Sequence, residues 1–285
     1  MYRHSIEIHA HRGGRDLFPE NSISAFLRSA DLGVTAIELD LVISSDHRIV
    51  VSHDPWMNER LCLSPDGAEL KESDRERFRL YGMTYEQIRS FDCGNADPDY
   101  PLQQAIAGCK PLLSDVFDAV ETACASRGRP GSMVYNLEVK SWPEKVGVYH
   151  PAPDLYARFL VDGIMSSGVE SRIRLQSFDV HLLDALNRLF PGLSLGLLVA
   201  PGGDVEKLLA QLSCVPAFVN PFFGDMTVKL VGELHARQFR TVPWTVNEAD
   251  DMLKLISMGV DGLITDYPER AAGIAGLAAD GKNRV

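Results

Sequence analysis

The sequence predicts an α/β protein folded as a (β/α)₈ TIM barrel. Two observations indicate this fold: aliphatic runs alternate with helical periods along the whole chain, and the runs number eight. A third is the length of 285 residues, which such barrels reach as one domain. An open doubly wound sheet is the competing fold, but no glycine-rich phosphate loop follows the first run. We therefore expect a single barrel over residues 1–285.

The eight expected strands are short and rich in Ile, Val and Leu, as strands buried on both faces are. In chain order they are Ile6–Ala10, Ala36–Leu41, Met133–Val139, Ile173–Gln176, Leu195–Val199, Ala217–Asn220, Thr241–Trp244 and Gly262–Thr265.

Between these runs lie helices with recognisable ends. Ser22 is a predicted N-cap, and Gly33 supplies the left-handed stop of the same helix. Asn247 and Gly259 are expected to begin and end a later helix. Residues 153–168 repeat the arrangement with proline in the first turn.

The segment 42–110 is too long for one strand-to-helix loop, so we predict an insertion after the second strand. It begins as a hairpin over Leu41–Val51, turning at Ser45–Asp46, and continues as a loop. His47 stands in the turn, where a positive φ is tolerated by histidine more than by most residues. An insertion at this place is expected over the C-terminal mouth of the barrel, where active sites form.

The charge balance excludes some functions. With 28 Lys and Arg against 39 Asp and Glu, the net charge is −11, which disfavours nucleic acids and anionic membranes as partners. No run approaches the roughly 20 apolar residues of a membrane-spanning helix, so we expect no stable membrane association. Met1–Glu7 resembles no export signal, and we predict a cytoplasmic protein unless an export leader has been trimmed away. The oligomeric state is not predicted.

The five cysteines are odd in number and widely spaced, with no CxxC pair. The simplest interpretation is unpaired thiols in a reducing compartment.

Three carboxylates occupy positions where barrel strands should be apolar. Glu38 and Asp40 are two residues apart in one strand, so their side chains project from the same face. Glu138 and Lys140 share a face in the next parallel strand. Carboxylates converging on a barrel mouth repel one another unless a cation lies among them, and all-oxygen ligands suit Mg²⁺, Ca²⁺ or Mn²⁺. The alternative is a buried ion network in which Lys140 and Arg12 neutralise the carboxylates.

Two histidines stand at strand ends beside other polar residues. His11 closes the first strand and is followed by Arg12 and two glycines, and His53 follows the second arm of the hairpin. The chain has no GxSxG nucleophile motif, so two histidines favour general acid–base work without a covalent serine intermediate. The other six are interpreted as surface or packing residues: His4, His9, His47, His150, His181 and His235.

In this order and spacing, the motifs resemble those of the glycerophosphodiester phosphodiesterase family. The matching segments are His11-Arg12-Gly13, Pro19-Glu20-Asn21-Ser22, Ile37-Glu38-Leu39-Asp40, Val51-Ser52-His53-Asp54, Leu137-Glu138-Val139-Lys140, Gln176-Ser177-Phe178, Trp244-Thr245-Val246-Asn247 and Thr265-Asp266-Tyr267-Pro268. They span positions 11 to 268. Each motif is weak alone, but the ordered set is specific.

The resemblance implies metal-dependent hydrolysis of small-molecule glycerophosphodiesters to glycerol 3-phosphate and an alcohol. It implies one divalent cation, Mg²⁺ or Ca²⁺ with Mn²⁺ as a third choice. The roles it implies are metal ligands for Glu38, Asp40 and Glu138, an acid–base pair for His11 and His53, phosphate contacts for Arg12 and Lys140, support of the metal site for Glu20 and Asn21, and an aromatic at the mouth for Trp244. It also implies attack by the substrate's own hydroxyl through a cyclic phosphate.

Four other functions remain open. A lysophospholipase D or a glycerophosphoinositol-specific enzyme is the nearer alternative. A barrel glycosidase could use Glu38 and Glu138 as its carboxylate pair, but a neutral sugar needs neither Arg12 nor Lys140. A non-catalytic barrel should lack at least one catalytic position, and none is missing. Chelation separates the metal enzyme from the glycosidase.

Overall fold

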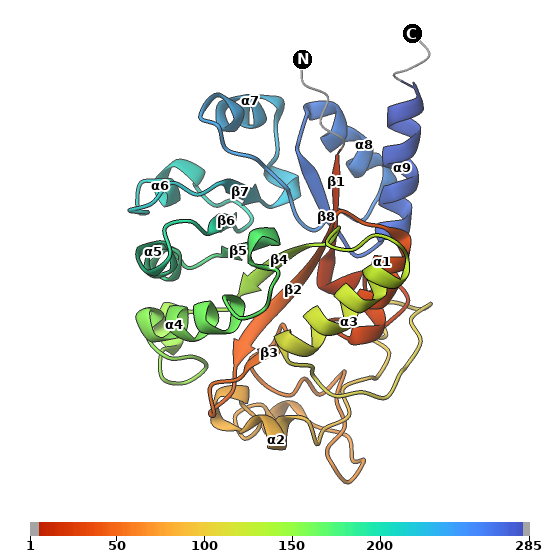
Figure 1. Cartoon of the computed structure of the whole chain (residues 1–285), viewed down its shortest axis with the longest axis vertical. Coiled ribbons are helices and arrows are strands. Elements are labelled where there is room, and N and C mark those ends of the chain that lie inside the picture. Colours follow the sequence, from red (N-terminus) through yellow and green to blue (C-terminus); the bar gives the residue numbers. More distant parts are fainter. Residues whose placement is uncertain (1–5, 282–285) are drawn as a thin grey trace.

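The computed structural model describes residues 6–281 and shows a curled sheet of parallel strands surrounded by helices (Figure 1). The strands are β1 (Glu7–Ala10), β2 (Ala36–Ile43), β3 (Ile49–Val51), β4 (Val134–Val139), β5 (Ile173–Ser177), β6 (Ser194–Val199), β7 (Phe218–Pro221) and β8 (Gly262–Thr265). They pair in parallel in the order β7-β6-β5-β4-β2-β1-β8, and β3 pairs antiparallel with β2.

The expected strand Thr241–Trp244 lies between the two ends of this sheet. Arg240 forms a single parallel bridge to Phe218 of β7, and Trp244 forms another to Phe222, the residue after β7. On the other side, the N–H of Ile264 in β8 donates to the carbonyl of Pro243 at 3.0 Å. The segment thus connects β7 to β8 and closes the barrel, although its pairing is too short to count as a regular strand. The predicted barrel is confirmed.

The helices cover the outside of the sheet (Figure 1). They are α1 (Ile23–Leu32), α2 (Tyr85–Ile88), α3 (Leu113–Ser126), α4 (Pro153–Ile164), α5 (Val180–Leu189), α6 (Val205–Leu209), α7 (Val228–Ala236), α8 (Ala249–Met258) and α9 (Pro268–Gly281). Short 3₁₀ turns connect several of them, the first over His11–Gly13.

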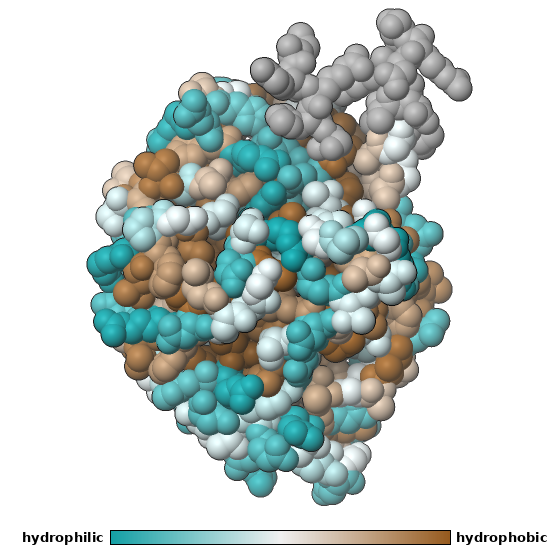
Figure 2. Space-filling view, viewed as in Figure 1, coloured by the Kyte–Doolittle hydropathy of each residue, from teal (hydrophilic) through white to brown (hydrophobic). Residues whose placement is uncertain are grey.

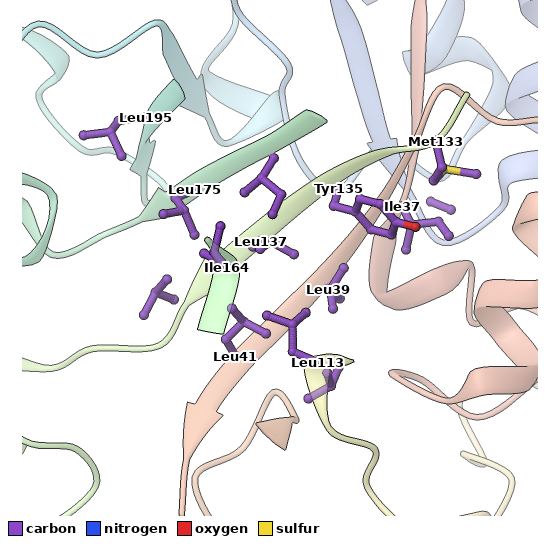
Figure 3. Packing of buried hydrophobic residues seen from close by; sticks show 14 of the residues in the cluster. Ile37, Leu39, Leu41, Leu113, Met133, Tyr135, Leu137, Ile164, Leu175 and Leu195 are labelled. Atoms are coloured by element: carbon purple, nitrogen blue, oxygen red, sulfur yellow. The ribbon is translucent and has the colours of Figure 1, made fainter. Parts of the chain in front are cut away.

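Alternation along the strands sorts side chains between the helix layer and the barrel interior. Leu39 and Leu41 of β2 point to the helix layer, where they pack with Leu113 of α3 (Figure 3). The alternate residues Glu38 and Asp40 point the other way. The register pairs Asp40 directly with Glu138 of β4, so this alternation brings the carboxylates together inside the barrel.

Polar residues also lie inside the barrel near the N-terminal ends of its strands. Arg174 of β5 donates to Glu7 of β1 at 2.6 Å, and His9 lies 3.1 Å from the same carboxylate. His9 is therefore a packing residue, as predicted, whereas the ion pair beside it was not expected. His4 lies outside the described residues.

The β2–β3 hairpin has the register Leu41↔Val51 and turns at residues 44–48. His47 adopts the positive φ of 61° that its place in the turn suggested, and its ring stacks on Phe159 at 4.1 Å. The chain from β3 to α3 then carries a hydrophobic cluster of its own, which includes Met57, Leu80 and Ile88. Figure 2 shows mainly hydrophilic residues over the part of this segment that surrounds α2.

Two helix boundaries differ from the prediction. Glu248, not Asn247, is the N-cap of α8. The side chain of Asn247 instead donates to Asp266 at 2.7 Å, a contact across the end of β8 that the local sequence does not reveal. The helix predicted over 153–168 ends at Ile164. The Ser22 cap and the Gly33 stop are confirmed for α1.

The prediction of unpaired thiols is wrong for two cysteines, because Cys62 and Cys93 form a disulfide. An antiparallel bridge between Leu63 and Asp92 brings them together across 31 positions, a pairing that the spacing does not show. The remaining three cysteines of the chain are free. The argument from thiols for a reducing compartment is therefore lost, and the cytoplasmic location stays a prediction.

Candidate active site

The loop after β1 places a histidine and an arginine at the barrel mouth. His11 and Arg12 lie in a tight 3₁₀ turn, and Arg12 adopts a φ of 52°. Gly13 follows with a φ of 88°, and a Cβ there would lie 2.8 Å from the ring of Phe26. Only glycine allows α1 to approach the turn this closely. The packing of α1 thus fixes where His11 and Arg12 point.

Glu38, Asp40 and Glu138 form a buried acidic triad. Each offers an oxygen, and these three oxygens lie within 4.8 Å of one another. Arg12 contacts two members of the triad: its backbone N–H donates to Glu38 at 2.9 Å, and the Nε atom of its guanidinium lies 3.3 Å from Asp40. Lys140 Nζ contacts Asp40 at 2.9 Å and Glu138 at 2.5 Å. The ion network and the acidic cluster predicted from the sequence are both present.

The positive charges of Arg12 and Lys140 act unequally on the pKa values of Asp40 and Glu38. Burial would raise the pKa of Asp40, but Lys140 and Arg12 hold that pKa well below its usual value. Burial and repulsion from Asp40 and Glu138 raise the pKa of Glu38 well above its usual value. One carboxylate of the three thus resists ionisation, because Arg12 and Lys140 do not offset the whole cluster.

Asn21 and Glu20 support this cluster from the loop before α1. Asn21 donates to Asp40 Oδ2 at 2.8 Å and accepts from the Asp40 N–H at 3.2 Å. Glu20 Oε2 accepts from Arg12 and from Arg15, each at 2.7 Å. Both residues orient charged side chains of the site, and no contact of Glu20 with the triad is present among the described residues.

His11 is held by a buried aspartate at the end of β8. Its Nδ1 lies 2.6 Å from Asp266 Oδ1, which leaves Nε2 for the cavity. Asp266 also accepts from Arg15, Tyr100 and Asn247 at 2.7 to 2.9 Å. Burial would raise the pKa of Asp266, but His11 and Arg15 keep it below its usual value. Burial lowers the pKa of His11, and Asp266 opposes that shift.

His53 has a matching partner but a more open position. Its Nδ1 lies 3.0 Å from Asp54 Oδ1, and Asn58 donates to the other oxygen of Asp54 at 2.6 Å. The His53 side chain is 36% exposed, against 11% for His11. The hairpin therefore returns His53 to the mouth as predicted.

A cavity of about 300 Å³ brings most of these groups together. We call it the catalytic cavity; its lining includes His11, Arg12, Glu38, His53, Glu138 and Lys140. Trp244 and Phe178 form an aromatic wall, with ring centroids 5.4 Å apart. Trp244 also donates its indole N–H to the carbonyl of Asn220 at 3.0 Å, which fixes the ring.

Sequence reasoning did not assign three residues of this site. Asp54 directly follows His53 in a matched motif, and that adjacency was the available signal. Asp266 also stands inside a matched motif, but nothing in the sequence links it to His11, which lies 255 positions away. Arg15 had no signal, because only the fold places its guanidinium between Glu20 and Asp266, at 2.7 and 2.9 Å.

Comparisons with known proteins show which proteins this chain is similar to. The model of the glycerophosphoryl diester phosphodiesterase family matches residues 11–270. A glycerophosphodiester phosphodiesterase of Caldanaerobacter subterraneus is 30% identical, covering 91% of this chain and 93% of its own.

Two solved structures share the fold. A Silicibacter pomeroyi structure has a TM-score of 0.84 at 27% identity, with 98% and 95% of the two chains covered. A phosphodiesterase of Oleispira antarctica in complex with sn-glycerol-3-phosphate has a TM-score of 0.74 at 20% identity, with 95% and 96% covered. The family match spans nearly the whole chain, and the chain therefore belongs to the glycerophosphoryl diester phosphodiesterase family of phosphoric diester hydrolases.

Proposed function

We propose that this enzyme hydrolyses glycerophosphodiesters to glycerol 3-phosphate and an alcohol, with a divalent cation held by Glu38, Asp40 and Glu138. The observation that carries the proposal is the catalytic cavity, in which an acidic triad, two cations and two histidines converge. Few other chemistries need all of these groups in one place.

The residues present fit a divalent cation. Glu38 shows that the site can accept more positive charge, because its pKa stays high although Arg12 and Lys140 are in place. A second source of positive charge would let all three carboxylates ionise, and oxygen ligands are those that Mg²⁺, Ca²⁺ and Mn²⁺ prefer. When bound, the cation would supply electrostatic stabilisation of charge on the phosphoryl oxygens.

Arg12 and Lys140 are proposed to bind the phosphodiester. Each already contacts the triad, so their charges are fixed before substrate arrives. Such preorganised cations stabilise charge that builds on phosphoryl oxygens in the transition state. This local positive charge explains how a protein of net charge −11 can take an anionic substrate.

His11 and His53 are proposed as the acid–base pair. Both use Nδ1 for a carboxylate, so in both the Nε2 atom is free to exchange a proton with substrate. One accepts the proton of the attacking oxygen, and the other donates to the leaving alcohol. Such proton transfers contribute roughly 10²–10⁴-fold in rate.

The attacking oxygen is proposed to be the glycerol hydroxyl next to the phosphate ester. Its attack on phosphorus expels the alcohol and forms a cyclic phosphate, which water then opens to glycerol 3-phosphate. The proposal draws support from proximity, because an oriented intramolecular hydroxyl can reach an effective molarity of roughly 10⁵ M or more. It also needs no nucleophilic side chain.

A panel of glycerophosphodiesters tests the function. Glycerophosphocholine, glycerophosphoethanolamine, glycerophosphoinositol and lysophosphatidylcholine are assayed with Mg²⁺, Ca²⁺, Mn²⁺ or chelator. The readout is release of glycerol 3-phosphate from the three deacylated substrates and release of choline from lysophosphatidylcholine. We expect the enzyme to hydrolyse the deacylated substrates. Chelator should abolish this activity, and added metal should restore it. Turnover of lysophosphatidylcholine alone, or full activity in chelator, would contradict the proposal.

A further inference from the structure

A second cavity adjoins the catalytic cavity. We call it the α1 cavity; it has a volume of about 250 Å³ and lies between the start of α1, the end of β3 and the chain before α3. Its lining includes Glu20, Ser24, His53, Ile106, Lys110 and Asp115. None of the functions derived above uses this space.

His53 is the wall that the two cavities share, because its side chain lines both. Glu20 is a second link. Its Oε2 holds Arg12 and Arg15, which line the catalytic cavity, while Glu20 itself lines the α1 cavity. Its other oxygen, Oε1, receives no hydrogen bond from the described residues and is left for a ligand.

The two cavities differ in the chemical groups that line them, so each suits a different half of the substrate. Glu38 and Glu138 of the acidic triad line the catalytic cavity, and no triad residue lines the α1 cavity. Hydroxyl oxygens can join the oxygen ligands of a divalent cation held by the triad, so the glycerol half of the substrate belongs in the catalytic cavity. The other ester arm must then leave past His53. On the basis of the proposed function, we propose that the α1 cavity binds the leaving alcohol and favours a small cationic amino alcohol.

The charges of the α1 cavity favour a cation. Glu20 and Asp115 contribute two carboxylates against the one ammonium of Lys110, and Arg12 and Arg15 engage only the Oε2 atom of Glu20. Lys110 Nζ is engaged by Ser52 Oγ at 2.9 Å, and burial lowers the pKa of Lys110. Apolar contact comes from Ile106 and Leu61, which suit the methyl groups of a quaternary amine. The volume is below the roughly 300–1,000 Å³ of pockets for drug-sized ligands, so the head group must be small.

The outer wall is built in advance of binding. The N–H of Ile106 donates to Gly94 at 2.9 Å, and the N–H of Cys93 donates to Gly108 at 2.7 Å. A Cβ on Gly94 would lie 1.7 Å from the Ile106 carbonyl, so the two segments touch through their backbones. The Cys62–Cys93 disulfide joins this wall to the chain around Leu61. A rigid wall can discriminate between head groups by size.

The size test fills the α1 cavity with Ile106→Trp. The matched control is Leu102→Trp, in the same segment but 74% exposed and outside both cavities. We measure kcat/KM for glycerophosphocholine and for the methyl ester of glycerol 3-phosphate, whose leaving methanol is too small to fill the cavity. Ile106→Trp should lower the ratio of the first value to the second by roughly 10-fold or more, as steric rejection in a shaped pocket does. Leu102→Trp should not change it.

The charge test uses Asp115→Asn, which keeps an oxygen to accept the N–H of Leu112. Asp118→Asn on the same helix is the control, since Asp118 lines neither cavity. Asp115 is exposed, so we expect the preference for glycerophosphocholine over glycerophosphoglycerol to fall by about two- to fivefold, the worth of a solvent-screened pair.

Saturation-transfer NMR with choline reads out binding without turnover. Choline in chelator buffer should receive saturation from the wild-type chain and much less from Ile106→Trp. If no glycerophosphodiester is hydrolysed, the proposed function fails, and the NMR arm still tests the cavity. If hydrolysis occurs but both variants keep the wild-type ratios, or choline binds equally to Ile106→Trp, the α1 cavity is not the head-group site.

Discussion

At the scale of single residues, the site consists of short-range pairs that set the state of each functional group. His11 relies on Asp266, His53 on Asp54, and Arg12 on Glu20, at 2.6, 3.0 and 2.7 Å. His11 is more buried than His53, so solvent screens the attraction between His11 and its carboxylate partner less. The first of these pairs leads to a prediction on the pH dependence of turnover.

Replacing Asp266 by Asn should slow turnover and move one limb of the pH profile. Asp266 raises the pKa of His11 against the effect of burial, so its loss lowers that pKa further. Whichever form of His11 is active, the limb that belongs to it should move to lower pH, and kcat should fall by up to roughly 10²–10⁴-fold. The measurement is kcat against pH.

Tyr100→Phe is the control for that experiment. Tyr100 donates to Asp266 Oδ2 at 2.8 Å without touching His11, so its loss should leave the limb nearly in place. A purely structural role of Asp266 would instead lower activity in both variants with no movement of the limb.

Replacing Glu138 by Gln should weaken metal binding while keeping the shape of the side chain. Loss of a partner that only orients a ligand costs roughly 10–100-fold in affinity, and loss of a ligand should cost at least that. Metal affinity is measured by calorimetry, and folding by circular dichroism. Wild-type affinity in a folded Glu138→Gln protein would remove Glu138 from the metal site.

Residue identity and strand alternation were enough to predict the triad. Glu38 and Asp40 lie two apart in one strand, and the parallel register with β4 places Glu138 beside Asp40. Asp266 could not be inferred as the partner of His11, because 255 positions separate them and only closure of the barrel brings them together.

At the scale of elements, strands and α1 followed from local patterns, whereas the chain between β3 and α3 did not. Its hydrophobic cluster draws on widely spaced residues such as Met57, Leu80 and Ile88, which show no regular period. It contains little regular structure, with α2 only four residues long. The contacts that hold this segment together join residues far apart in the sequence, as the disulfide between Cys62 and Cys93 does.

Counting thiols tests this pairing directly. Alkylation of the denatured, unreduced protein should modify three cysteines, and alkylation after reduction should modify five. Intact mass measures both numbers. Closing a loop with a disulfide typically contributes about 2–4 kcal/mol to the free energy of unfolding, so reduction should also lower thermal stability. Five modified thiols without reductant would show that the bond does not form.

At the scale of the whole molecule, the barrel collects groups from distant parts of the chain at one end. Residues in or directly after β1, β2, β4 and β8 line the catalytic cavity, and the hairpin adds His53. Among residues 6–281, no helix has the length and apolar character to cross a membrane. The ordered motifs made this convergence predictable, because parallel strands of a barrel all present their carboxyl ends to the same mouth.

The most demanding prediction concerns the nucleophile, which the protein itself does not supply in our proposal. A glycerophosphocholine analogue that lacks the hydroxyl next to the phosphate ester should not be hydrolysed, because the oriented intramolecular attack is worth an effective molarity of roughly 10⁵ M or more. Arg12 and Lys140 should still bind its phosphodiester, so the analogue should inhibit competitively.

The measurement compares release of choline from the two substrates and the inhibition constant of the analogue. If the analogue neither binds nor reacts, a third compound that keeps the hydroxyl oxygen as a methyl ether separates lost binding from lost attack. Turnover of the deoxy analogue at a rate close to that of glycerophosphocholine would assign the attack to water, with His11 or His53 as its base.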